Sequence, residues 1–432
     1  MLDLRWREIV ARFTDRWAVS DIAHGRRWSF AELAAAADAQ PARLHRSAGG
    51  VDLVCPTGRG MEFILELLRG WRAGAVTCAL DADQIRPVVT SLSPAVRHLK
   101  ITSGTTGAGK VVGFTAAQLA ADVDQLVPAM GLHRDSPNLA VLSLAHSYGF
   151  SSLVMPLLLH GIPLILAESA LPVAVSRALT GQAPVTLPAV PALWRTWHET
   201  GVIRAGLYRA ISAGAPLPLA LEQAVFADCG IKLHNFLGAT ECGGIAYDPT
   251  EQPREDAAYV GMAIPGVRLA TTSDGHLSVR GANVGAGYLA TTGESVAGGF
   301  GADGYVTADL AEVAADGRVW LRGRSGDVIN VAGRKVLPEV IERRLLAHPA
   351  VVDCLVLGVP DPANRGECIG VAVVARGEVS VSVLRDFLLA EIPSWQVPRK
   401  WWWVAELTSN GRGKRSRREW ANRFADVPGD GT

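Results

Sequence analysis

One segment of this 432-residue chain is dense in glycine and hydroxyl groups: Ile101-Thr102-Ser103-Gly104-Thr105-Thr106-Gly107-Ala108-Gly109-Lys110. The glycines let backbone N–H groups approach phosphate oxygens, while the hydroxyls and the lysine supply further donors. A plain turn between two elements needs neither so many hydroxyls nor a closing lysine. The segment therefore predicts a loop that binds the phosphates of a nucleotide.

A competing interpretation of this loop is the P-loop of ATPases and kinases. Residues Gly104 to Lys110 fit the pattern G-x-x-x-x-G-K, but that pattern continues with Ser or Thr to bind Mg²⁺, and Val111 follows here. No apolar strand ending in aspartate offers the second metal-binding element. A P-loop ATPase or kinase thus rests on half a motif and stays the weaker alternative.

Read as Thr-Ser-Gly-Thr-Thr-Gly-x-x-Lys, the loop resembles the signature of the acyl-adenylate-forming superfamily. This family includes acyl-CoA synthetases, aryl-acid ligases, adenylation domains of peptide synthetases, and luciferases. The resemblance implies an ATP-binding loop with Thr105 also near Mg²⁺. Its phosphate-binding residues are then Thr102, Ser103, Gly104, Thr105, Thr106, Gly107 and Lys110.

Two further motifs follow in the family's order. Residues 212–217, Ser-Ala-Gly-Ala-Pro-Leu, are similar to the turn along the adenine, which assigns the base to Gly214 and Ala215. Residues 235–241, Asn-Phe-Leu-Gly-Ala-Thr-Glu, are similar to Tyr-Gly-x-Thr-Glu, although Leu stands in place of the Tyr. By resemblance Gly238 belongs to the nucleotide site, Thr240 bonds the α-phosphate and Glu241 binds Mg²⁺, a role that suits a carboxylate.

The second half of the chain carries three more matches. Tyr305-Val306-Thr307-Ala308-Asp309 resembles Thr-Gly-Asp, so that Asp309 would accept hydrogen bonds from both ribose hydroxyls. Residues 323–333 resemble the family's hinge, with Arg324 at ribose or phosphate and Asp327 as the pivot. Residues 407–417 resemble the terminal Gly-Lys-x-x-Arg motif, which makes Lys414 the catalytic lysine. Charge runs of this kind are otherwise solvated tails.

One segment bears on the identity of the substrate. It is Leu142-Ser143-Leu144-Ala145-His146-Ser147-Tyr148-Gly149-Phe150, which resembles the family's acyl-pocket motif. His146 is either a pocket residue near the carboxylate or a buried structural histidine. Because this segment holds no carboxylate to pair with an α-ammonium group, an amino acid substrate is disfavoured. Aryl acids and medium or long acyl chains stay open, and we expect an aromatic or short acid.

Composition excludes several classes of protein. Hydrophobic residues make up 49% and charged residues 19%, and 42 basic residues balance 42 acidic ones, so that no global field favours nucleic acid or an anionic membrane. The most apolar stretch, residues 153–167, is too short and too interrupted to span a bilayer. Six scattered cysteines indicate reduced thiols in a soluble, cytoplasmic enzyme.

The pattern of elements predicts an α/β protein. Short β-branched runs alternate with Ala/Leu-rich segments, which indicates a large layered α/β N-terminal domain of several subdomains over residues 1–326. A small, mobile α+β domain over residues 327–432 would follow the hinge, including a helix over 338–346, strands over 351–357 and 370–374, and a helix over 382–391. The segment between Ala79 and Thr102 is shorter than the family leads us to expect, which leaves an oligomer surface possible.

These features together predict an ATP- and Mg²⁺-dependent acid–thiol ligase. It would adenylate a small-molecule carboxylic acid, release pyrophosphate, and pass the acyl group to coenzyme A or to the phosphopantetheine of an acyl carrier protein. We expect a freestanding ligase, since no carrier domain follows the terminal motif. The alternatives are an amide-forming ligase using the same acyl-adenylate, the P-loop enzyme, and a degenerate homologue that binds nucleotide without turnover.

Overall fold

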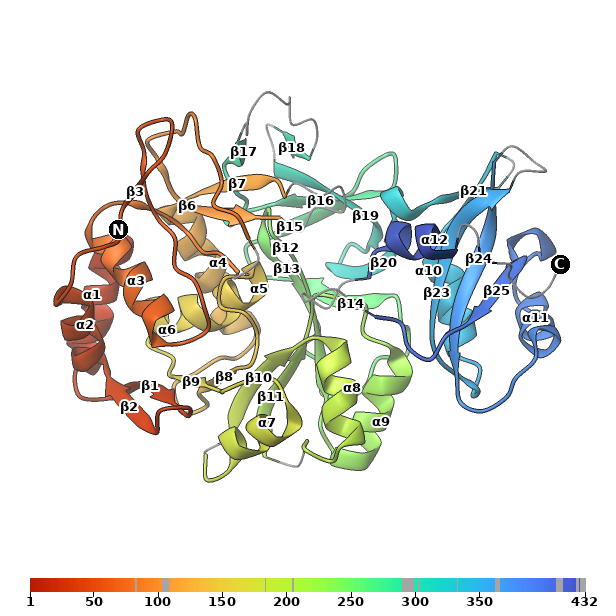
Figure 1. The fold of residues 1–432 in the computed structure, drawn as a ribbon, viewed down its shortest axis with the longest axis horizontal. Coiled ribbons are helices and arrows are strands. Elements are labelled where there is room, and N and C mark those ends of the chain that lie inside the picture. Colours follow the sequence, from red (N-terminus) through yellow and green to blue (C-terminus); the bar gives the residue numbers. More distant parts are fainter. Residues whose placement is uncertain are drawn as a thin grey trace.

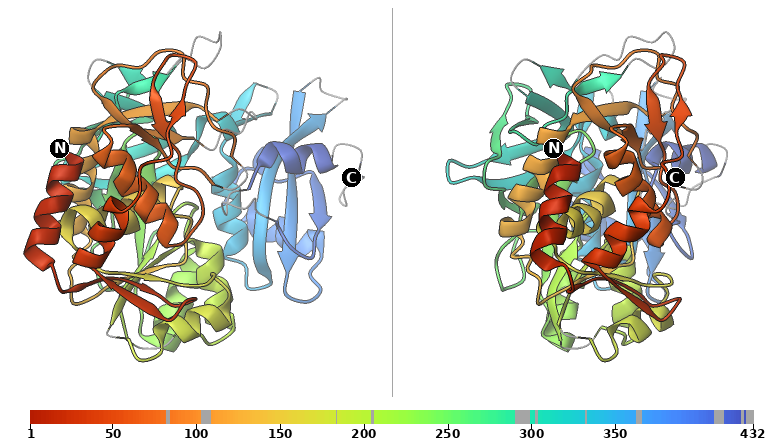
Figure 2. Two further views of the ribbon diagram at one scale, coloured as in Figure 1. Left: turned by 60° about the vertical axis from the view of Figure 1, so that its left-hand side comes forward. Right: turned by 90° about the vertical axis from the view of Figure 1, so that its left-hand side faces the viewer.

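A computed structural model describes residues 1–81, 84–102, 109–182, 184–203, 206–289, 299–301, 304–331, 333–361, 366–408, 415–424 and 427. It shows a layered α/β body with a smaller α+β body beside it. Strands β23 to β25 lie at one side of the molecule in Figure 1 and in the left view of Figure 2, and behind the large body in the right view of Figure 2. The predicted fold class is confirmed.

The large body is built on a 14-stranded sheet whose strands run in the order β15-β16-β19-β20-β14-β13-β12-β11-β10-β8-β9-β1-β2, with β18 paired to β19. Its parallel part comprises β1 (Trp17–Asp21), β9 (Leu164–Leu166), β8 (Asn138–Ala140), β10 (Val185–Ala189), β11 (Leu207–Ser212) and β12 (Leu233–Ala239). The antiparallel strands are β2 (Arg26–Ser29), β13 (Gly243–Tyr247), β14 (Tyr259–Ala263), β15 (Arg268–Thr271), β16 (His276–Arg280), β18 (Phe300–Gly301), β19 (Gly304–Val313) and β20 (Arg318–Arg324).

A second sheet of six strands has the order β17-β7-β6-β5-β4-β3. Its strands are β3 (His45–Arg46), β4 (Asp52–Val54), β5 (Val76–Cys78), β6 (Val96–Ile101), β7 (Val111–Thr115) and β17 (Gly287–Leu289). The described residues that link β5 to β6 contain no helix, which agrees with the shortened segment that we noted in the sequence.

Helices pack on these sheets through apolar faces. One core joins both sheets through α1 (Leu2–Phe13), α2 (Phe30–Asp38), α3 (Met61–Arg72), α4 (Ala116–Ala129), the π-helix η1 (Phe150–Val154) and α6 (Met155–His160). A separate core joins the parallel strands to α7 (Pro172–Leu179), α8 (Pro191–Glu199) and α9 (Leu219–Cys229). The short helix α5 (Ser147–Gly149) precedes η1.

The small body begins after the 3₁₀ turn η2 (Ser325–Asp327). It contains the pair β21 (Ile329–Val331) and β22 (Arg334–Val336), and the sheet of β23 (Val351–Asp361), β24 (Gly366–Ala375) and β25 (Lys400–Trp403). Its helices are α10 (Pro338–Leu346), α11 (Val381–Leu389), the turn η3 (Ser394–Gln396) and α12 (Arg417–Phe424). The buried residues of its two cores all come from Ile329 onward.

Among the helices of the described chain, none combines the length and the apolar character needed to cross a bilayer. The apolar segment 153–167 instead forms part of η1, helix α6 and the short strand β9.

Candidate active site

The motifs that bear chemistry meet because several of them follow parallel strands of the large sheet. His146 follows β8, Gly214 and Ala215 follow β11, and Thr240 with Glu241 follows β12. Neighbouring parallel strands present their carboxyl ends at one edge, and ligands of open α/β sheets bind at that edge. Gly214 has φ +85° and is exposed beside the edge, where backbone can approach a planar ligand.

The neck of the phosphate loop is closed by two hydrogen bonds between its ends. Thr102 N donates to Lys110 O at 2.8 Å, and Lys110 N donates to Thr102 Oγ1 at 3.0 Å. A Cβ on Gly109 would lie 2.5 Å from Thr102 O, so this position requires glycine. The predicted phosphate-binding residues Ser103, Gly104, Thr105, Thr106 and Gly107 lie outside the described residues.

Glu241 and Lys110 are linked through Tyr288, a residue that the sequence analysis did not find. The Tyr288 hydroxyl donates to Glu241 Oε1 at 2.8 Å, and Lys110 Nζ lies 4.8 Å from the centre of the Tyr288 ring. Strand β17 brings Tyr288 into place by pairing antiparallel with β7, where Tyr288 faces Val112. A lone tyrosine has no local signal that would reveal these distant partners.

Tyr305 extends this cluster, with its hydroxyl 3.2 Å from that of Tyr288. Burial raises the pKa of both phenols, and the nearby Glu241 carboxylate raises them further. Both hydroxyls are therefore protonated at neutral pH, so that Tyr288 acts as a donor and holds the Glu241 carboxylate in one orientation.

Asp309 and Arg324 face each other across the β19–β20 pair, and Arg324 Nε donates to Asp309 Oδ1 at 2.7 Å. The Asp309 side chain is 11% exposed and that of Arg324 is 52% exposed. The Asp309 charge raises the pKa of the Arg324 guanidinium, and Glu241 and Asp327 add to this effect. The two residues predicted to contact ribose and phosphate thus lie together within the field of Glu241.

His146 caps helix α5, where its Nδ1 accepts a hydrogen bond from Tyr148 N at 3.3 Å. Behind this segment, Lys100 Nζ donates to Ser151 Oγ at 3.2 Å and lies 4.0 Å from Asp122 Oδ2. Burial lowers the pKa of Lys100, and the Asp122 charge opposes this shift. His146 therefore has a capping role, and the buried ion pair of Lys100 and Asp122 lies beneath residues 146–151.

Two positions bear on the missing tyrosine of the Tyr-Gly-x-Thr-Glu motif. Phe236 is buried, with its ring centre 5.6 Å from that of Tyr148, whereas Leu237 is half-buried. Phe236 belongs to the core and does not supply an exposed ring in place of the tyrosine.

The predicted hinge residue Asp327 contacts the terminal segment. Arg417 Nε lies 3.3 Å from Asp327 Oδ2, and the same guanidinium pairs with Glu339 at 3.0 Å and with Glu342. Although burial opposes it, these carboxylates raise the Arg417 pKa well above its usual value. At Arg417 the basic run is a fixed part of the small body and not a solvated tail, while Lys414 lies outside the described residues.

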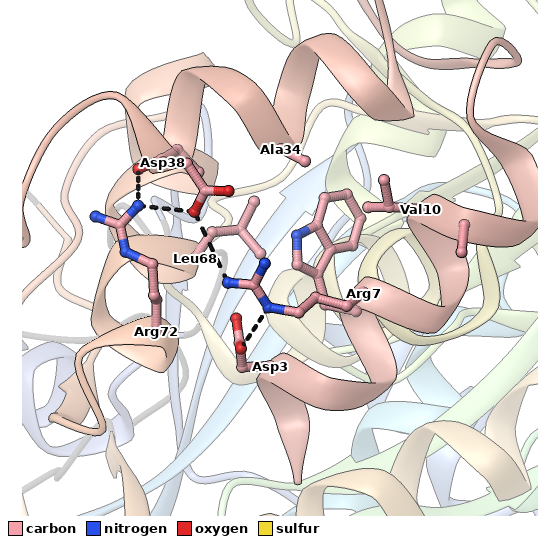
Figure 3. Close-up of a pocket in the computed structure, with 10 residues that line it drawn as sticks. Asp3, Arg7, Val10, Ala34, Asp38, Leu68 and Arg72 are labelled. Atoms are coloured by element: carbon pink, nitrogen blue, oxygen red, sulfur yellow. Dashed lines mark hydrogen bonds and ion pairs between the residues drawn. The ribbon is translucent and has the colours of Figure 1, made fainter.

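A hollow of about 240 Å³ lies away from this site, between α1, α2 and α3 (Figure 3). Its charged residues pair with one another, as Arg7 does with Asp3 at 2.8 Å and Arg72 with Asp38 at 2.7 Å. None of the predicted site residues lines it, so we regard it as a groove between surface helices.

The described donors fit a nucleotide that carries Mg²⁺. Lys110 and Arg324 are cations suited to phosphate oxygens, and the Glu241 carboxylate is an oxygen ligand of the type that Mg²⁺ prefers. The close approach at Gly109 leaves no room for a side chain at the neck of the loop.

Comparison with known proteins gives the family of the chain. The model of the AMP-binding enzyme family matches residues 98–300, and that of the AMP-binding enzyme C-terminal domain matches residues 340–414. The mitochondrial malonate–CoA ligase of Mus musculus is 28% identical over 74% of this chain and 63% of its own length. The 2,3-dihydroxybenzoate-AMP ligase of Bacillus subtilis is 28% identical over 76% of this chain and 64% of its own length.

The chain thus spans less than two thirds of the length of these relatives. Among solved structures, ATP-bound MatB from Rhodopseudomonas palustris superposes with a TM-score of 0.84 and 20% identity, covering 99% of this chain and 100% of that one. The two family models occur in the expected order and together span well over half of the sequence. This chain belongs to the family of AMP-binding enzymes, the acyl-adenylate-forming superfamily.

Proposed function

We propose that this protein is an ATP- and Mg²⁺-dependent acid–thiol ligase that forms an acyl-adenylate. The observation that carries the proposal is the cluster of Lys110, Tyr288 and Glu241, which joins the neck of the phosphate loop to the end of β12. The carboxylate of the acid attacks the α-phosphorus of ATP, a new P–O bond forms, and the bond to pyrophosphate breaks. The reaction brings two anions together, so it needs cations and donors fixed where charge develops.

In this proposal the residues of the site have separate tasks. Lys110 and Thr102 bind the phosphates with the loop between them, and Thr240 bonds the α-phosphate. Asp309 binds the ribose, and Arg324 contacts ribose or phosphate. Mg²⁺, held by Glu241 and near Thr105, would neutralise charge on the phosphate oxygens. Gly214, Ala215 and Gly238 are backbone contacts of the nucleotide, and Lys414 bridges the acid and the α-phosphate.

The second step transfers the acyl group to a thiol. Sulfur attacks the carbonyl carbon, the bond to AMP breaks, and AMP leaves. We propose that residues 327–432 form the mobile domain, that it turns about Asp327, and that this motion withdraws Lys414 and admits coenzyme A or a carrier-protein phosphopantetheine. Cores made only of residues from Ile329 onward support a body that can turn as a unit.

For the acid we propose a short or aromatic compound. The two relatives described above, each aligned over about three quarters of this chain, carry names that specify malonate and 2,3-dihydroxybenzoate. The acyl-pocket segment also rests on a buried polar cluster of Lys100, Asp122 and Ser151, in place of a wholly apolar wall.

A cytoplasmic location stays part of the proposal. Burial raises the pKa of the Cys78, Cys242 and Cys354 thiols, which makes these cysteines poor nucleophiles. This fits reduced, structural cysteines.

The test is acid-dependent ATP–pyrophosphate exchange over a panel of short dicarboxylates, benzoates, cinnamates and fatty acids. Exchange needs no acceptor, so it reports on adenylation alone, and acceptors (coenzyme A, a carrier protein and amines) are added afterwards. Lys414→Ala should abolish exchange while ATP binding persists, and Asp327→Pro should spare exchange but slow thioester formation. ATP binding without exchange for any acid would indicate a degenerate homologue, and acid-independent release of ADP would indicate a P-loop enzyme.

A further inference from the structure

Two arginines from different bodies converge on one carboxylate, that of Asp353 on β23. Arg415 Nη1 donates to Asp353 Oδ1 at 2.9 Å, and Arg415 Nη2 contacts Oδ2. Arg195 Nη1 donates to the same Oδ2 at 3.2 Å. The Asp353 side chain is only 11% exposed, while each arginine is 27% exposed, so the cluster is largely shielded from solvent.

The two arginines differ in what they join. Arg415 and Asp353 both belong to the small body, so their bidentate pair moves with it. Arg195 lies on α8 of the large body, and its pair with Asp353 exists only while the two bodies keep this orientation. The cluster therefore combines a permanent contact with one that depends on orientation.

Helix α8 is a rigid support next to the candidate site. It begins directly after Val190, at the carboxyl end of β10, and Val190 lies 3.4 Å from the position of a Cβ on Gly214. Trp194 is fully buried, and its Nε1 donates to Ile211 O of β11 at 3.3 Å. Arg195, the next residue, thus reaches the small body from a fixed point beside the adenine turn.

We propose that Asp353 is a positioning residue for the adenylation step. By accepting from Arg195 it docks the small body on α8, and by accepting from Arg415 it fixes the residue that directly follows Lys414. Consecutive Cα atoms are about 3.8 Å apart, so an anchor on Arg415 limits where Lys414 can lie. This inference rests on the proposed function, because the step that it assists is adenylation.

The expected effect is moderate, because the Arg195–Asp353 pair is only partly buried. Loss of such a pair changes an orientation equilibrium by roughly two- to tenfold. Arg195→Met should lower the exchange rate by at most that factor while leaving thiolysis of a supplied acyl-adenylate unchanged, since thiolysis needs the other orientation. Arg195→Lys should restore part of the rate. Arg177→Met, which removes an exposed pair with Glu168 inside the large body, is the matched control.

The distance between the two bodies can be measured independently of activity, and this measurement tests whether Asp353 docks the small body on α8. Spin labels on p-acetylphenylalanine, placed at the exposed positions Leu171 and Val383, report the separation of the bodies by pulsed electron resonance. The proposal expects one dominant distance in the parent protein and in Arg177→Met, and a second or broadened population in Arg195→Met and Asp353→Asn. The same distribution in all four proteins would overturn it, whatever the exchange rates. Absence of exchange in the parent protein would count against the proposed function, while the distances would still test the docking.

Discussion

At the scale of the residue, the site depends on how single side chains are held. Glu241 has a conformation set by Tyr288, and Asp309 by Arg324. The motifs predicted Glu241, Asp309 and Arg324 because each is part of a local pattern. The motifs did not predict roles for Tyr288 and Asp353. Their partners, Glu241 and Arg415, are 47 and 62 residues away in the chain, and a local pattern carries no information on such contacts.

Tyr288→Phe removes the hydroxyl that orients Glu241 and leaves the ring against Lys110. A hydrogen bond to a charged group contributes about 1.5–3 kcal/mol, so we expect the exchange rate to fall about tenfold or more. The Mg²⁺ concentration for half-maximal rate should rise, and a Mg²⁺ titration of the exchange rate measures both. Tyr208→Phe, which removes a hydroxyl bonded to Gly131 O at 3.0 Å, is the control. Equal Mg²⁺ curves for parent and Tyr288→Phe would show that this hydrogen bond does not orient a metal ligand.

His98 should make stability sensitive to acid. Its ring is 1% exposed, lies 4.4 Å from that of Phe150, and is hydrogen-bonded to Thr77 Oγ1 at 2.7 Å. Burial, with help from the Lys100 charge, holds the His98 pKa well below the usual 6.5. Below pH 6.5 His98 is protonated in the unfolded chain but stays neutral in the folded chain. The free energy of unfolding therefore decreases as the pH falls below 6.5.

Urea unfolding at pH 7.5 and 5.5 tests this effect. Between pH 7.5 and pH 5.5, the free energy of unfolding of the parent protein should fall by about 1 kcal/mol more than that of His98→Gln. The same loss in His98→Gln as in the parent would contradict the account.

At the scale of the element, helix and strand predictions succeeded where the side-chain pattern was local. Helix α10 has the predicted bounds, Pro338–Leu346, because proline fits the first helical turn and Ile341 and Leu345 fall on one face. Strand β24 extends beyond the predicted 370–374 to Gly366–Ala375, since its pairing with β23 and not its own pattern determines its length. Sheet order was not predictable, because it depends on contacts between distant segments.

The β12–β13 turn behind Glu241 offers an element-scale test. Gly243 has φ +65°, and a Cβ there would lie 2.1 Å from Asp122 Oδ1, the oxygen that accepts from Gly244 N at 2.9 Å. Gly230 has φ +66° but nothing within 4 Å. Gly230→Ala should therefore cost only backbone strain of about 1 kcal/mol, and Gly243→Ala about 2 kcal/mol more. Urea unfolding measures both variants, and equal costs would show that the turn and α4 are not packed as described.

At the scale of the whole molecule, the structure has two bodies with separate cores. Both bodies contain helices and strands, so the type of secondary structure does not distinguish them. What distinguishes them is that the buried residues of the last two cores lie within Ile329–Phe424. The contact between Arg195 of α8 and Asp353 of the small body was likewise beyond prediction, because the two residues are 158 positions apart in the chain.

Residues 327–432 should therefore fold on their own. Within the structure of the whole chain, Trp401, Trp402 and Trp420 are buried. If the isolated fragment keeps this fold, its tryptophan emission should be blue-shifted. The emission should then change in one cooperative transition as urea is added. The same fragment unfolded in concentrated urea provides the reference for exposed tryptophans. A fragment with exposed tryptophans and a gradual transition would show that the small body needs the large one to fold.

The central claim is that the acid becomes an acyl-adenylate. Once the exchange assay has identified an acid, the most direct measurement uses that acid with both carboxylate oxygens labelled with ¹⁸O, together with ATP and the thiol acceptor. Attack on the α-phosphorus followed by thiolysis must leave one labelled oxygen in AMP, and mass spectrometry of the released AMP should show it. Label in inorganic phosphate, with ADP as the nucleotide product, would mean attack on the γ-phosphorus and would contradict the account.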